Sequence, residues 1–77
     1  MTAELVRDVA RILEGPAETA EKALEARLRG VGSVPPVAEL LTLGARAREQ
    51  RASGEELALA VGALLAFHAE PAGAAFL

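Results

Sequence analysis

Glycine and proline interrupt this chain of 77 residues at three places, and these breaks most constrain how it can fold. Between the breaks, apolar residues recur at the three- and four-residue spacing that is typical of one face of a helix. No segment alternates in the manner of a strand. We therefore expect an all-α fold, a compact bundle of four short helices with an apolar C-terminal tail. The predicted helices span about residues 3–14, 16–29, 36–52 and 54–69.

The predicted helix ends follow from residues with known preferences at helix termini. Gly15 is expected to close the first helix in a left-handed conformation, and Pro16 then suits the first position of the second helix. Gly30 is expected to end the second helix. Ser53-Gly-Glu-Glu56 fits a capping box. In that motif, the side chains of Ser53 and Glu56 each accept a hydrogen bond from the other residue's backbone N–H.

Composition argues against catalytic and metal-binding functions. The chain has no cysteine and a single histidine, so thiol chemistry and thiolate or histidine-rich metal sites are not expected. Gly30-Val-Gly-Ser33 lacks the Lys-Ser/Thr ending of a P-loop and follows a predicted helix instead of a strand. The helical neighbours of His68 are Leu64, Leu65 and Ala72, which can neither orient it nor act as nucleophiles. We expect no enzyme, no catalytic or metal site and no cofactor.

The chain is expected to be a cytoplasmic bacterial protein. Its longest charge-free run, residues 57–69, has 13 residues and is shorter than the ~20 that span a bilayer. Met-Thr-Ala-Glu-Leu at the N-terminus lacks the basic and apolar regions of a secretory signal. Arginine outnumbers lysine seven to one and asparagine is absent, a bias that suits a GC-rich bacterial genome.

Arg46, Arg48 and Arg51 are the candidate nucleic-acid contacts. Helical spacing predicts that Arg48 and Arg51 share a face while Arg46 points elsewhere, and arginines near a helix C-terminus also complement the helix dipole. The net charge of −3 opposes attraction to phosphates. Nucleic acid is therefore not the expected partner.

Residues 48–62 resemble the opening of a phage-repressor-type helix-turn-helix. The similar features are an Arg/Glu helix, then Ser-x-Glu-Glu-Leu-Ala, then Gly62 at the position of the turn. The resemblance implies a DNA-associated transcriptional regulator. In that family the helix after the glycine reads bases with polar side chains, whereas residues 63–68 are Ala-Leu-Leu-Ala-Phe-His. A regulator with a degenerate helix-turn-helix is thus an alternative function.

The uneven distribution of apolar residues carries the main functional prediction. They make up 52% of the chain, but nearly half of them are alanine, and they are crowded into the fourth helix and the tail. Residues 57–69 are apolar all round, which predicts a helix that is buried on most sides. Ala58, Gly62 and Ala66 form a strip along which another helix can approach closely. A domain this small has little interior in which to bury such a helix.

We therefore expect residues 1–77 to form a single domain that acts as a non-catalytic protein–protein interaction or adaptor module. The partner is another protein or a second copy, so the chain self-associates or is a small subunit of a larger bacterial assembly. Residues 70–77 are a candidate docking tail, in cis or in trans. An isolated structural domain of unknown role is a further alternative. The predicted partner-binding residues are Leu57, Val61, Leu64, Leu65, Phe67, Phe76 and Leu77.

Overall fold

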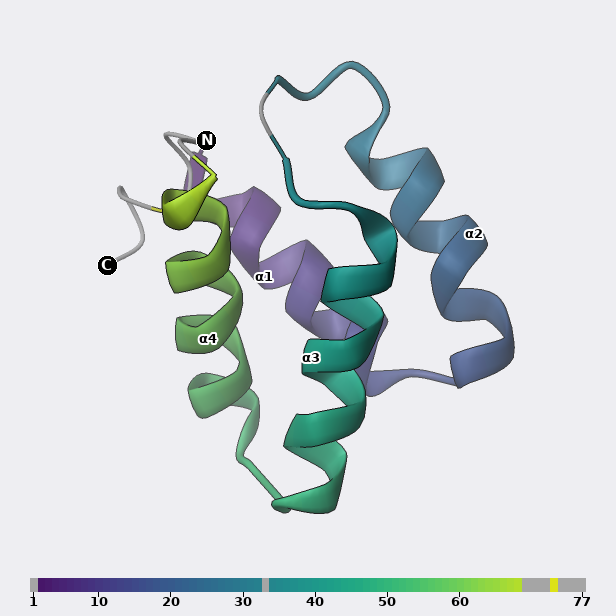
Figure 1. Ribbon diagram of the computed structural model, residues 1–77, viewed down its shortest axis with the longest axis vertical. Coiled ribbons are helices and arrows are strands. Elements are labelled where there is room, and N and C mark those ends of the chain that lie inside the picture. Colours follow the sequence, from purple (N-terminus) through teal and green to yellow (C-terminus); the bar gives the residue numbers. More distant parts are fainter. Residues whose placement is uncertain (1, 33, 69–72, 74–77) are drawn as a thin grey trace.

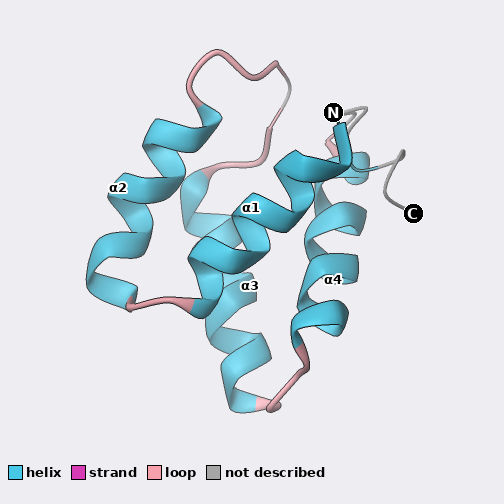
Figure 2. Ribbon diagram, turned by 180° about the vertical axis from the view of Figure 1, so that it is seen from behind, coloured by secondary structure: helices cyan, strands magenta, loops and turns pink. Residues whose placement is uncertain are grey.

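A computed structural model describes residues 2–32, 34–68 and 73 and confirms the predicted all-α bundle. Its helices are α1 (Thr2–Glu14), α2 (Ala17–Leu28), α3 (Val37–Glu49) and α4 (Gly54–Phe67). In Figure 1, α3 and α4 run side by side in opposite directions, and α1 passes behind them. The reverse view in Figure 2 places α1 in front, with α2 on the far side of α3 from α4.

Both α1 and α3 contact the other three helices, and α1 makes the more extensive contacts of the two. Its apolar residues recur at helical spacing, so they form one continuous face while the charged residues lie on the other side. Among the described residues, α1 supplies five side chains to the apolar core. These buried side chains are Leu5, Val6, Val9, Ala10 and Leu13.

The fourth helix, α4, is buried along one face, which corrects the prediction of a helix covered on most sides. Its core-facing residues are Leu57, Ala58, Val61, Gly62 and Leu65. They pack toward α1 and α3, whereas α2 makes no contact with α4 in the described part of the chain. Two neighbouring helices cover only part of a helix surface, so the opposite side of α4 is open.

The third helix ends at Glu49, about three residues before the predicted end, because Arg51 has a positive φ of 53°. The backbone N–H of Ala52 donates to the carbonyl of Ala47 at 2.9 Å, and that of Arg51 donates to the carbonyl of Arg48 at 3.2 Å. These two bonds define a Schellman motif, in which glycine usually occupies the left-handed position. Here an arginine occupies it.

The first helix ends by a different device from the one predicted. Gly15 is not in the left-handed region; the described glycine with a positive φ is Gly30, at 81°. The carbonyls at the end of α1 are instead bound by a side chain from α3. Nη2 of Arg48 donates to the carbonyl oxygens of Gly15 at 2.9 Å and of Leu13 at 3.4 Å. Pro16 was predicted at the first helical position of α2. It is instead the N-cap residue, and the helix begins one residue later, at Ala17.

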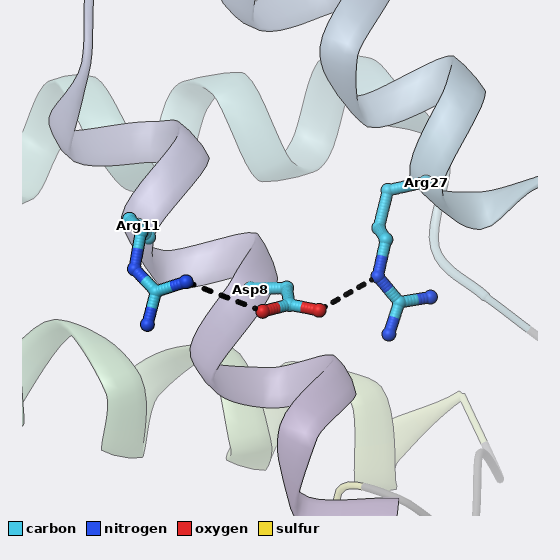
Figure 3. A network of polar contacts seen from close by, with 3 residues as sticks. All are labelled: Asp8, Arg11 and Arg27. Carbon is cyan, nitrogen blue, oxygen red and sulfur yellow. Dashed lines mark hydrogen bonds and ion pairs between the residues drawn. The ribbon is translucent and has the colours of Figure 1, made fainter.

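Asp8 joins α1 to α2 through its carboxylate (Figure 3). Oδ2 accepts a hydrogen bond from Nε of Arg27 at 2.9 Å, and Oδ1 lies 3.5 Å from Nη1 of Arg11 on the next turn of α1. The side chains of Asp8 and Arg27 are each 36% exposed, so water weakens the pair. The contact orients two helices that share a short connection, and it adds modestly to stability.

The predicted capping box is present at the start of α4. Oγ of Ser53 accepts from the backbone N–H of Glu56 at 3.1 Å, and Oε1 of Glu56 accepts from the backbone N–H of Ser53 at 2.8 Å. The hydrogen bonds from Ser53 favour the ionised carboxylate and lower the pKa of Glu56 below its ordinary value of 4.5.

Candidate functional site

The outer α4 face, defined here as Leu59, Ala63 and Phe67, carries the large exposed apolar side chains of the described residues. Leu59 is 47% exposed and Phe67 is 83% exposed, and Ala63 is an exposed residue between them at four-residue spacing. No charged residue lies between Glu56 and His68. Single exposed apolar residues are common, but three on one uncharged stripe form a surface that another protein can cover.

The α3–α4 groove runs beside this face. It has a volume of about 370 Å³ and is lined by Ala38, Glu39, Thr42, Leu43 and Arg46 of α3 and Leu64 of α4. Its lining is apolar in the middle, where Leu43 and Leu64 are half-buried. Glu39 and Arg46 lie two helical turns apart on α3, so the groove carries one charge of each sign.

His68 meets Glu39 at one end of the groove. Nε2 of His68 lies 3.1 Å from Oε2 of Glu39, but it makes no hydrogen bond, although this nitrogen is buried. The two groups therefore lie side by side without a hydrogen bond between them. The ring of His68 also meets that of Phe67 edge to face, with centroids 5.4 Å apart. These contacts fix the ring of His68 and place Phe67 near the Glu39 end of the groove.

The predicted partner-binding residues divide into three groups. Leu57, Val61 and Leu65 pack in the chain's own core, where at most 4% of each is exposed. Leu64 lines the groove and Phe67 is exposed, so these two side chains are accessible. Phe76 and Leu77 lie outside the described residues, as does the rest of the predicted tail except Gly73.

Gly73 is buried against α4. A Cβ atom at this position would overlap the carbonyl oxygen of Gly62 and the amide nitrogen of Ala66. Part of the predicted strip of small residues is therefore used by the chain itself, through backbone-to-backbone packing.

Sequence reasoning did not single out Leu59 and Ala63. In a run that is apolar all round, periodicity cannot tell which side faces the core. They lie four and eight residues before Phe67, on the side opposite Val61 and Leu65, and this spacing is the signal that could have identified them.

The three candidate arginines lie in different settings. Arg48 and Arg51 line one shallow hollow together with Glu14, and Arg46 lines the α3–α4 groove, which matches their predicted faces. Arg48 already donates to the two carbonyls at the end of α1. Glu14 places a negative charge in the hollow. The basic groups therefore do not form a continuous phosphate-binding surface.

The resemblance to a helix-turn-helix does not extend to the structure. Gly62, which would mark the turn, lies inside the continuous helix α4 and is buried. The turn in this region is formed by residues 50–53, before α4 begins. The continuous helix therefore argues against the alternative of a DNA-associated regulator.

Within residues 2–32, 34–68 and 73, no group of three or more acidic, histidine or cysteine residues is placed to hold a metal ion. No helix in the same residues has the length and apolar character needed to cross a membrane. In comparisons with protein-family models, with curated proteins and with solved structures, nothing matches this chain.

Proposed function

We propose that this chain is a non-catalytic protein–protein interaction module whose docking surface is the outer α4 face together with the α3–α4 groove. The single observation that supports the proposal is the 83% exposure of Phe67, a large apolar ring beside a groove. Aromatic side chains contribute strongly to protein interfaces, because they bury a large area for little conformational freedom lost. Leu59 and Leu64 extend the apolar area around this anchor.

The proposal includes a bacterial, cytoplasmic setting, in which the chain is an adaptor or a small subunit of an assembly. The arginine-rich, asparagine-free composition supports the bacterial source. The role does not require acid–base groups, because docking depends on apolar area and shape and not on proton transfer.

Light scattering coupled to size exclusion, combined with capture of proteins on the immobilised chain from a bacterial extract, tests the proposal. The full native chain is compared with Phe67→Ser. The matched control is Ala26→Ser, which introduces the same residue at an exposed position of α2. We expect association of the native chain, with itself or with captured proteins, to be lost in Phe67→Ser and kept in Ala26→Ser.

The proposal is contradicted by a native chain that stays monomeric at high micromolar concentration and captures nothing that Phe67→Ser fails to capture. Circular dichroism of both variants shows that the comparison concerns folded chains.

A further inference from the structure

We infer that the partner of this surface is a second copy of the chain, packed antiparallel about a two-fold axis that passes between Thr42 and Leu43. The inference rests on the proposed function and adds the identity and the orientation of the partner. Three features of the α3–α4 groove support it: the charges near its two ends, its shape, and the hydrogen bond that Thr42 already makes.

The two charges of α3 that line the groove, Glu39 and Arg46, complement those of a second copy in an antiparallel orientation. In an antiparallel helix pair with its two-fold axis between positions 42 and 43, Glu39 faces Arg46 of the partner subunit. The symmetry repeats this pair, so two ion pairs form about 10 Å apart along the helix. A parallel arrangement in the same register would place Glu39 against the same residue of the other copy, and like charges repel.

Both charged groups are available for this pairing. The Glu39 side chain is 50% exposed although it lies beside His68, so one of its oxygens can meet a partner. Arg46 is exposed, and its guanidinium makes no hydrogen bond or ion pair with another described residue. The guanidinium of Arg46 can therefore pair with the Glu39 carboxylate of a second copy without breaking an existing contact.

The surface between the two charged ends suits a helix contact. Leu43 and Leu64 are half-buried, so a second copy packed on this face would cover their exposed parts. Thr42, next to the axis, donates its hydroxyl to the carbonyl of Ala38 at 2.9 Å. Because that donor already has a partner, the contact leaves no hydroxyl donor unpaired at the centre of the interface.

The shape of the same face is also complementary to itself. Phe67 projects near the Glu39 end, where His68 contacts Glu39. Near the Arg46 end lies a hollow of about 160 Å³, whose lining includes Leu43, Ala47, Ala60 and Arg46. The antiparallel two-fold brings Phe67 of each copy to this end of the other copy. There the ring can enter an apolar recess beside a guanidinium.

The molecule has enough surface for a stable interface. A typical interface covers about 800 Å² of each partner, which is roughly a sixth of this chain's 4743 Å². Helices α3 and α4, whose residues line the groove, run side by side on a broad face of the molecule, which extends 28 × 24 Å (Figure 1).

Charge-swapped variants of the full chain test the orientation. Glu39→Arg gives two Arg–Arg contacts in the dimer, and Arg46→Glu gives two Glu–Glu contacts. We expect each single variant to weaken self-association about tenfold or more at low salt. An equimolar mixture of the two should recover dimers, because only the mixed pair has opposite charges at both contacts. The double variant Glu39→Arg/Arg46→Glu should recover them on its own.

Sedimentation equilibrium of the native chain, both single variants, their mixture and the double variant provides the measurement. The control is Glu25→Arg, an exposed charge reversal on α2, which should leave association unchanged. Glu39→Arg also removes the contact with His68, whereas Arg46→Glu keeps it. Weakened association in Arg46→Glu, together with an unchanged circular dichroism spectrum, therefore separates an effect on the interface from an effect on folding.

The inference is overturned if the native chain dimerises but neither the mixture nor the double variant recovers what the single variants lose. It is also overturned if the native chain is monomeric and captures another protein through Phe67. In both cases the proposed function stands. A chain that neither dimerises nor captures any protein through Phe67 overturns the two together.

Discussion

Among the residues that the structure describes, Arg51 is the non-glycine residue with a left-handed backbone. This conformation makes position 51 a specific target for stabilisation. A Cβ atom is unfavourable at this φ, whereas glycine adopts it freely. We predict that Arg51→Gly raises the free energy of unfolding by about 0.5 to 1 kcal/mol. Urea denaturation followed by circular dichroism measures the change. The same substitution inside the helix, Arg46→Gly, should lower stability by about 1 kcal/mol, and equal effects at both positions would contradict the argument.

Glu56 predicts a pH dependence that the capping box causes. The pKa of Glu56 is lowered in the folded chain, so folding favours its ionised form. This contribution is fully present above the unfolded pKa, near 4.5, and is lost as the pH falls through the lower folded pKa. The stability advantage of the native chain over Glu56→Gln should therefore shrink as the pH is lowered past 4.5. Denaturation curves at several pH values measure this, with Glu21→Gln as an exposed control; an unchanged advantage at low pH would refute it.

At the scale of helices, Arg48 holds the end of α1 against α3. Hydrogen bonds from a charged donor contribute about 1.5 to 3 kcal/mol when buried, and these two are partly exposed. We predict that Arg48→Ala lowers the free energy of unfolding by about 1 to 2 kcal/mol. Arg29→Ala, at the exposed end of α2, should change it by less than about 0.5 kcal/mol. Similar losses in both variants would indicate a general charge effect instead of a specific cap.

The helices themselves were predictable from sequence where the signal was local. The capping box of Ser53 and Glu56 fixed the start of α4, because both partners lie within one turn. The ends of α1 and α3 were predicted less well. Arg48 reaches the carbonyl of Gly15 from 33 residues away, and the left-handed Arg51 lacks the glycine that usually marks that conformation. Contacts between distant segments leave no local pattern.

At the scale of the whole molecule, substitutions in the core and on the proposed docking surface should differ strongly in their effect on the free energy of unfolding. Leu40 is fully buried, so Leu40→Ala should cost about 2 to 5 kcal/mol. A chain of 77 residues has a total stability of about 4 to 12 kcal/mol, so much of it would be lost. Phe67→Ser should change the stability of the monomer by less than about 0.5 kcal/mol. Thermal unfolding at a low, fixed concentration measures both, and a large loss in Phe67→Ser would show that the ring packs within the chain.

The proposed surface was only partly predictable from sequence. The excess of apolar residues in the fourth helix indicated that some of them would be exposed, and Leu64 and Phe67 were named. Leu57, Val61 and Leu65 were named with them, yet they lie in the core. Which side of a uniformly apolar helix faces inward depends on where α1 and α3 pack, and that arrangement arises only in the assembled bundle.

The packing of α1 on α4 has a consequence for biosynthesis. α1 ends at Glu14, but the helix with which it makes its most extensive contact ends at Phe67. At synthesis rates of about 5 to 20 residues per second, roughly 3 to 10 s separate the two ends. During that interval the apolar face of α1 has no helix α4 to cover it, whereas α3 and α4 emerge in succession and can pair at once. The apolar face of the nascent helix α1 is therefore not fully covered until the last helix of the bundle has been made.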